Sequence, residues 1–124
     1  MKTLSLNNSI FLVNPISGKL SLKKKIKIIN NVIKGTKAKI VITNSEKDAK
    51  EKAAKYMQEK NIVVACGGDG LMNIVAQQAI LNNCIMGVFP FGRGNDFASS
   101  LNIFSFNEIT KSFKSPTIIK VKYI

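Results

Sequence analysis

The chain has 124 residues, of which 45% are hydrophobic, which fits one packed domain, alone or within a larger protein, and leaves no apolar run long enough to cross a membrane. Its net charge of +12 favours anionic partners, although lysine supplies 18 of the 19 basic residues and a lysine- and asparagine-rich proteome would give the same bias. Histidine is absent, which excludes imidazole-based triads, zinc sites and general bases.

The first half of the chain alternates between strand-like and helix-like segments. Residues 9–13 are an apolar run typical of a buried strand. In residues 22–33 the apolar positions recur at spacings of four, three and four, which predicts an amphipathic helix that Gly35 can end. A second strand is predicted at 38–43, and a helix follows at 45–60 with Ser45 as its N-cap.

The second half continues the alternation. A strand is predicted at 62–66, a helix at 71–82 and a strand at 84–89. Further elements are predicted as short helices at 96–101 and 106–113 and a β-branched strand at 117–123. This order predicts an α/β fold, a mainly parallel sheet with helices on both faces. Ligands of such sheets bind at the carboxyl ends of the strands, where the polar and glycine-rich segments of this chain fall.

The lysines and the two cysteines give weaker indications of the partners and the location of the protein. The lysines are expected on polar helix faces, as at 23–27, without interleaved aromatic residues, so we expect no nucleic-acid partner. The positive charge also suits a peripheral contact with an anionic membrane. Cys66 and Cys84 lie in apolar surroundings and are expected to be buried free thiols of a cytoplasmic protein, and the N-terminus has no signal-peptide pattern.

The segment 14–19 follows the first predicted strand. It could cradle a phosphate with the Ser17 hydroxyl, the bare Gly18 amide and the charge of Lys19. The alternative is a strand-to-helix turn in which Ser17 is an N-cap. The spacing of a P-loop is absent.

The run Gly67-Gly68-Asp69-Gly70 follows the third predicted strand. Its glycines would let the backbone approach a polyphosphate, and Asp69 could hold Mg²⁺ or orient a phosphate-bound water. Asn73 lies on the same helix face as Gly70. The alternative is a tight turn with Asp69 as the N-cap.

The run Gly92-Arg93-Gly94-Asn95-Asp96 follows the fourth predicted strand and contains the one arginine of the chain. A guanidinium between two glycines suits a phosphate group. The alternative is an exposed turn in which Asn95 or Asp96 caps the next helix. Thr43, at the end of the second strand, could reach a ribose or base, or could simply bond the backbone.

Three segments in this order resemble motifs of the catalytic domain of the diacylglycerol kinase and related lipid kinase family. They are Asn14-Pro15-Ile16-Ser17-Gly18, the run from Gly67 to Asn73, and the run from Pro90 to Ala98. The resemblance covers residues 9 to about 102. The third motif is the most specific, because Gly-Gly-Asp-Gly is shared with NAD kinases and phosphofructokinases.

The resemblance implies a phosphofructokinase-like or NAD kinase-like nucleotide-binding domain and ATP-dependent phosphorylation of a diacylglycerol- or sphingosine-like lipid hydroxyl, as in phospholipid biosynthesis. It places Asp69 in a catalytic position beside the phosphates and Mg²⁺. The ATP contacts that it implies are Asn14, Pro15, Ile16, Ser17, Gly18, Thr43, Gly67, Gly68, Asp69, Gly70, Leu71, Met72, Asn73, Arg93, Gly94 and Asn95.

The chain departs from the family pattern at four positions. Leu71 replaces the family threonine, although the Leu71-Met72 pair resembles the sphingosine kinase branch, while Ile74 replaces a glutamate, Arg93 a threonine and Ser99 an arginine. The resemblance also implies a second, β-rich lipid-binding domain that carries the general base, so residues 1–124 are expected to be the ATP-binding domain alone. The competing hypotheses are an NAD kinase-like enzyme and a non-catalytic nucleotide-binding or membrane-associating module.

Overall fold

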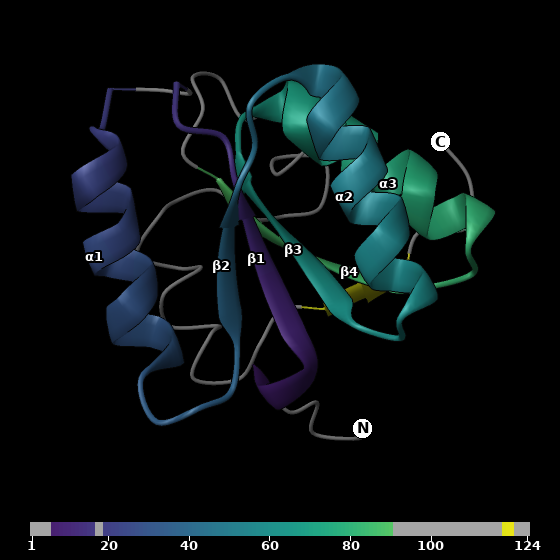
Figure 1. Ribbon diagram of the computed structural model, residues 1–124, viewed down its shortest axis with the longest axis horizontal. Helices are drawn as coiled ribbons and strands as arrows, with labels where there is room; N and C mark the ends of the chain where they lie inside the picture. The colour runs from purple at the N-terminus through teal and green to yellow at the C-terminus, as the bar shows by residue number, and fades with distance from the viewer. Residues whose placement is uncertain (1–5, 17–18, 91–117, 121–124) are drawn as a thin grey trace.

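The computed structural model describes residues 6–16, 19–90 and 118–120 (Figure 1). In this part of the chain the strands form one sheet in the order β2-β1-β3-β4-β5. The first four strands are parallel, and β5 runs antiparallel to β4. The strands are β1 (Ser9–Val13), β2 (Lys39–Ile42), β3 (Ile62–Gly67), β4 (Ile85–Pro90) and β5 (Ile118–Lys120), and a short 3-10 helix (Leu6–Asn8) precedes β1.

Three α-helices connect the parallel strands. They are α1 (Leu22–Ile33), α2 (Glu46–Gln58) and α3 (Asp69–Leu81). Figure 1 shows α1 on one side of the sheet, with α2 and α3 side by side on the other. The predicted α/β fold is thus confirmed, with element bounds close to those expected. The helices predicted at 96–101 and 106–113 lie outside the described residues.

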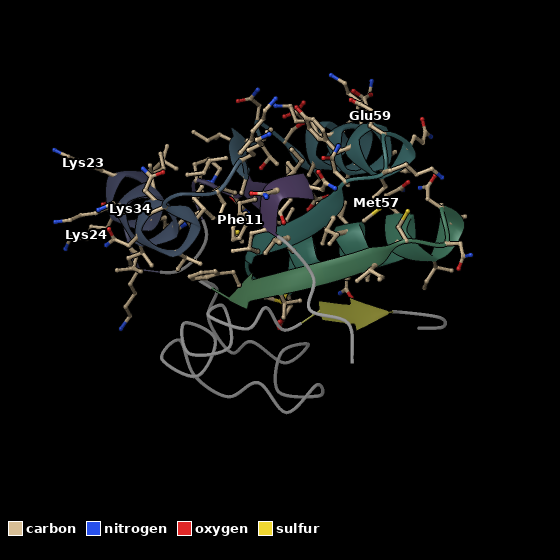
Figure 2. All side chains as sticks on the ribbon, turned by 90° about the horizontal axis from the view of Figure 1, so that it is seen from below. Phe11, Lys23, Lys24, Lys34, Met57 and Glu59 are labelled. Atoms are coloured by element: carbon tan, nitrogen blue, oxygen red, sulfur yellow. The ribbon has the colours of Figure 1, made fainter. Side chains whose placement is uncertain are left out.

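The core lies between the sheet and its helices. All five residues of β1 are buried, and so are the last five of β3, because these two strands are in the middle of the sheet. Phe11, in the middle of the molecule in Figure 2, and Phe89 are the largest apolar side chains that are fully enclosed. From α2 and α3, small residues and methionines complete the packing: Ala49, Ala53, Met57, Met72, Ala76 and Ala79.

Two of the helices begin with a serine cap. The Ser21 hydroxyl accepts the Lys24 amide at 3.2 Å and caps α1, and Ser45 accepts the Asp48 amide at 3.0 Å and caps α2. The Ser45 cap is therefore confirmed. The alternative of Ser17 as the N-cap of α1 is wrong, because α1 starts four residues later than that alternative requires. Gly35 follows the α1 C-cap with a φ of +80°, the left-handed conformation in which glycine commonly ends a helix.

Two expectations about side chains need correction. Lys25 is fully buried, whereas Lys23, Lys24 and Lys27 are exposed, so the lysines of α1 do not all lie on its polar face. Position 25 falls three residues after Leu22 and four before Ile29, which places it within the apolar stripe. Both cysteines are free, as predicted, but only one of them, Cys66, is buried, while Cys84 is partly exposed. No helix in the described segments is long and apolar enough to span a bilayer.

Candidate functional site

The strand order reverses direction between β1 and β3. The chain leaves β1 towards β2 on one side, then crosses back to β3 and continues to β4 on the other side. In open α/β sheets, the loops that diverge at such a point open a crevice at the carboxyl edge, and ligands bind there. The register brings the predicted motifs to this edge, because Val13 pairs with Ile42 on one side and with Cys66 on the other.

The residues that directly follow these three paired positions form a row along this edge. Thr43, Asn14 and Gly67 lie in neighbouring positions, and Gly67 pairs in turn with Pro90. The Thr43 amide donates to the Val13 carbonyl at 2.9 Å, and the Asn14 amide donates to the Cys66 carbonyl at 3.1 Å. The ends of β2, β1 and β3 are therefore held together by backbone hydrogen bonds.

The turn after β1 is shaped by Asn14. Its side-chain oxygen accepts the Ile16 amide at 3.0 Å, which closes a short turn over Pro15. Its carbonyl accepts a hydrogen bond from the Lys25 ammonium of α1 at 3.1 Å. The amide, carbonyl and side chain of Asn14 are thus each engaged, and the turn projects Ile16, with 87% of its surface exposed, towards solvent.

The Gly-Gly-Asp-Gly run forms the junction between β3 and α3 with almost no loop. Gly67 is the last residue of β3, Gly68 is the N-cap, and α3 starts at Asp69. The alternative of Asp69 as the N-cap is therefore wrong. The cap of α3 has no side-chain hydrogen bond, so its first-turn amides are not capped in the way that Ser45 caps α2.

The two outer glycines of this run have different surroundings. A β-carbon on Gly67 would lie 3.0 Å from Leu71 Cδ2 and 3.2 Å from Asn14 Cβ, so a side chain here would force these neighbours to move by a few tenths of an ångström. A β-carbon on Gly70 would meet no described atom within 4 Å. Packing therefore explains Gly67, whereas among the described residues no packing contact explains Gly70.

A pocket of about 260 Å³ lies at this edge, between the ends of β1 and β2 and the first turns of α2 and α3. Six of its lining residues belong to the predicted site: Asn14, Pro15, Ile16, Thr43, Gly70 and Leu71. Five others were not assigned to the site from the sequence: Asn44, Ser45, Glu46, Ala49 and Ile74. Four of these five follow β2 in the chain, and only Thr43 had been assigned to the site from this segment. Because ligands bind at the carboxyl ends of the strands, the rest of the segment could have been predicted as part of the site.

The other described residues of the predicted site do not line this pocket. Asp69 is half-buried and Asn73 exposed, at the start of α3 but outside the pocket lining. The Met72 side chain is fully buried in the core and contributes no polar group to this edge of the sheet. Ser17, Gly18, Arg93, Gly94 and Asn95 lie outside the described residues.

Two polar groups at the edge already have internal roles. The Thr43 hydroxyl donates to the Val13 carbonyl at 3.3 Å, and only 4% of the residue is exposed. Of the two roles predicted for Thr43, the structure thus shows the bond to the backbone. Asp48 accepts the Asn44 amide at 2.8 Å and pairs with Lys52 at 2.8 Å. The hydrogen bond from Lys52 lowers the pKa of the Asp48 carboxyl, and the Asn44 amide adds to this shift.

The described residues contain no cluster of three or more His, Cys, Asp or Glu side chains that could hold a metal ion by themselves. Asp69 is the carboxylate at the start of α3. One carboxylate combined with ligand phosphates is how Mg²⁺ is commonly bound, whereas Zn²⁺ needs a full set of protein ligands.

Comparison with known proteins gives a consistent result. The family model described as the diacylglycerol kinase catalytic domain matches residues 8–122. The fold matches a crystal structure of a diacylglycerol kinase from Bacillus anthracis with a TM-score of 0.70 and 19% sequence identity, covering 86% of this chain and 42% of that one. Two further structures of a proposed diacylglycerol kinase from the same organism match with the same values. The chain thus spans less than half the length of these proteins, and no curated protein matches it.

Proposed function

Because this chain belongs to the diacylglycerol kinase catalytic domain family, we propose that it is the nucleotide-binding part of a lipid kinase that transfers a phosphoryl group from ATP to a lipid hydroxyl. The acceptor would be of the diacylglycerol or sphingosine type. The observation that carries the proposal is the position of the uncapped start of α3 beside a pocket at the point where the strand order reverses.

The start of α3 supports phosphate binding. The first-turn amides of a helix have no partner within the helix, and the helix dipole favours an anion there. At this start the cap is Gly68, which has no side chain to occupy the amides, and Gly70 presents a bare backbone to the edge. A polyphosphate could therefore approach the backbone more closely than at a start covered by side chains.

The pocket supports binding of the nucleoside. Its walls combine apolar groups from Ala49, Leu71 and Ile74 with polar groups from Asn44 and Glu46. Such a mixture suits a base and a ribose, since an apolar surface binds the ring while a few polar groups fix its orientation. Ile16, exposed at the rim, could cover one face of the base.

Magnesium would accompany the phosphates, and Asp69 is the residue that we assign to it. When bound, Mg²⁺ supplies the positive charge that neutralises the transferring phosphoryl group. The contribution of the chain itself is to position the phosphates through the α3 amides and the nucleoside through the pocket. We assign the base that activates the lipid hydroxyl to a part of the family fold other than the part that residues 1–124 form.

The charge distribution supports a peripheral contact with an anionic membrane on the cytoplasmic side. No acidic residue occurs before Glu46, whereas seven exposed lysines lie at positions 19, 23, 24, 27, 34, 37 and 39. Figure 2 shows Lys23, Lys24 and Lys34 projecting from the α1 end of the molecule, away from Glu59, the C-cap of α2. Near an anionic bilayer, each lysine contributes on the order of 1 kcal/mol.

The proposal is tested first by titrating Mg-ATP into the chain in a calorimeter. We expect saturable binding that weakens about tenfold or more in Asp69→Asn, because a carboxylate in contact with a nucleotide-bound metal ion is lost. Asp48→Asn is the matched control, since Asp48 is also in the first turn of a helix but is bonded to Asn44 and Lys52. Equal affinity in all three proteins would contradict the assignment of Asp69.

A second experiment tests the acceptor. The complete protein, assayed with radiolabelled ATP and diacylglycerol or sphingosine in mixed micelles, should yield a phosphorylated lipid. Transfer to NAD instead would favour the NAD kinase-like alternative.

A further inference from the structure

A fully buried lysine lies directly beneath the candidate site. Lys25 has no exposed surface, although lysine is almost never fully buried unless its ammonium has a polar partner. It occupies the apolar stripe of α1 together with Ile29 and Ile33, where a leucine or isoleucine would pack at no desolvation cost. Packing alone therefore does not account for a lysine at this position.

The ammonium of Lys25 is directed at the turn after β1. It donates to the Asn14 carbonyl at 3.1 Å, and this carbonyl belongs to the Asn14-Pro15 peptide, which has no N–H. The Asn14 amide is bound on the opposite side by the Cys66 carbonyl of β3 at 3.1 Å. Lys25 and β3 thus hold Asn14 from two elements.

Small movements of Asn14 would affect both parts of the site. Asn14 lines the pocket, and its β-carbon is the atom that a side chain at Gly67 would meet at 3.2 Å. Its side-chain oxygen also holds the Ile16 amide at 3.0 Å. Asn14 therefore joins the pocket wall to the β3–α3 junction, and Lys25 is the helix residue that fixes its carbonyl.

The surroundings of the ammonium contain a thiol. Burial lowers the pKa of Lys25, while an interaction with Cys66 acts in the opposite direction. Burial also raises the pKa of the Cys66 thiol well above its usual range, so Cys66 is a neutral thiol at neutral pH. The contact with the Asn14 carbonyl is thus a hydrogen bond from the Lys25 ammonium in desolvated surroundings, where a hydrogen bond is stronger than in water.

We propose that Lys25 is a positioning residue for the nucleotide site, a role that rests on the proposed function: its ammonium orients the Asn14 turn so that the pocket wall and the β3–α3 junction are preformed. Lys25 does not contact the nucleotide in this proposal. It acts from the opposite side of the turn, through the Asn14 carbonyl.

The test replaces Lys25 by methionine, which keeps most of the buried volume and removes the hydrogen bond. We expect the Ile16 amide to exchange with solvent at least about tenfold faster, and Mg-ATP to bind about tenfold more weakly, since a hydrogen bond to a charged group contributes roughly that factor. Lys55→Met on α2 is the matched control, because it makes the same change at an exposed lysine. Thermal unfolding measured in parallel separates a positioning role from a loss of fold.

A second measurement uses the unmodified protein and does not depend on the variant folding. The ¹⁵N signal of the Lys25 ammonium should be resolved by slow exchange, and it should shift on addition of Mg-ATP, whereas the Lys55 signal should not. Unchanged Ile16 exchange in a folded Lys25→Met protein would overturn the proposal, as would unchanged Mg-ATP affinity or an unmoved Lys25 signal on binding. If the wild type binds no nucleotide, the proposed function fails, and Ile16 exchange alone then decides whether Lys25 fixes the turn.

Discussion

The starts of α2 and α3 lie at the same edge of the sheet, yet they are built in opposite ways. At α2, Ser45 accepts the Asp48 amide while Asp48 accepts the Asn44 amide and pairs with Lys52, so the chain's own side chains occupy the helix start. At α3 the cap is Gly68, with no side-chain hydrogen bond. A side chain thus caps α2, whereas none caps α3, and this contrast is the reason that we propose the anion site at α3.

Among the variants that test this comparison, Gly67→Ala should have the largest effect on stability and binding. The new β-carbon would lie 3.2 Å from Asn14 Cβ, and this neighbour, unlike the flexible end of Leu71, cannot move without shifting the turn. We expect a loss of roughly 1–3 kcal/mol in the free energy of unfolding, typical of overpacking, together with weaker Mg-ATP binding. Urea denaturation measures the first effect and calorimetry the second. An unchanged unfolding midpoint would show that the two loops are not in close contact.

Gly70→Ala should separate folding from binding. Gly70 is helical without a positive φ, and an alanine β-carbon would meet no described atom, so the fold should gain up to about 1 kcal/mol from the better helix former. The same methyl group would stand where the phosphates are proposed to approach, and Mg-ATP affinity should therefore fall. A variant that is more stable and binds Mg-ATP equally well would remove Gly70 from the proposed phosphate site.

Ser45→Ala tests the closed helix start. Removing the hydroxyl that accepts the Asp48 amide should cost about 1 kcal/mol of stability, the usual value for an N-cap. Mg-ATP affinity should change much less than in Gly70→Ala, since the proposed phosphate contacts are at α3. Chemical denaturation and calorimetry on the same samples give both values. A large loss of affinity in Ser45→Ala would mean that the α2 start, which lines the pocket, dominates binding.

The smallest effect concerns the pH dependence of stability. The pKa of Asp48 is lowered in the folded state, chiefly by its hydrogen bond from Lys52, so the charged form stabilises the fold. This contribution is fully present above the unfolded pKa of about 4 and is lost as the pH falls through the lower folded value. The acid-induced decrease in the melting temperature should be smaller in Asp48→Asn than in the wild type. Parallel curves for the two proteins would contradict this role.

Periodicity and glycine placement predicted the fold well, because each apolar run is flanked by clear breaks. Residues 9–13 and 22–33 were predicted with the bounds that the structure has. The junction at Gly67 was predicted in place but interpreted as a loop, whereas the strand continues through Gly67 and the helix begins at Asp69. Glycines allow either arrangement, and the choice depends on how closely Asn14 and Leu71 pack against Gly67.

The site was harder to predict than the fold, for two physical reasons. Lys25 was interpreted as a surface lysine because its charge was given more weight than its position in the apolar stripe, and its hydrogen bond to the Asn14 carbonyl could not be read from the sequence. Asn44 and Glu46 belong to the pocket because β2 lies beside β1 in the sheet, a neighbour relation that follows from strand order and not from any local pattern.

The most direct test of the central claim is a titration of Mg-ATP into the ¹⁵N-labelled chain, followed through the backbone amide signals. The account predicts that the amides of Gly68, Asp69 and Gly70 shift most and saturate together, with smaller shifts at Asn44 and Glu46 around the nucleoside. Saturable binding that leaves the amides at the α3 start unmoved, or no binding at all, would contradict it.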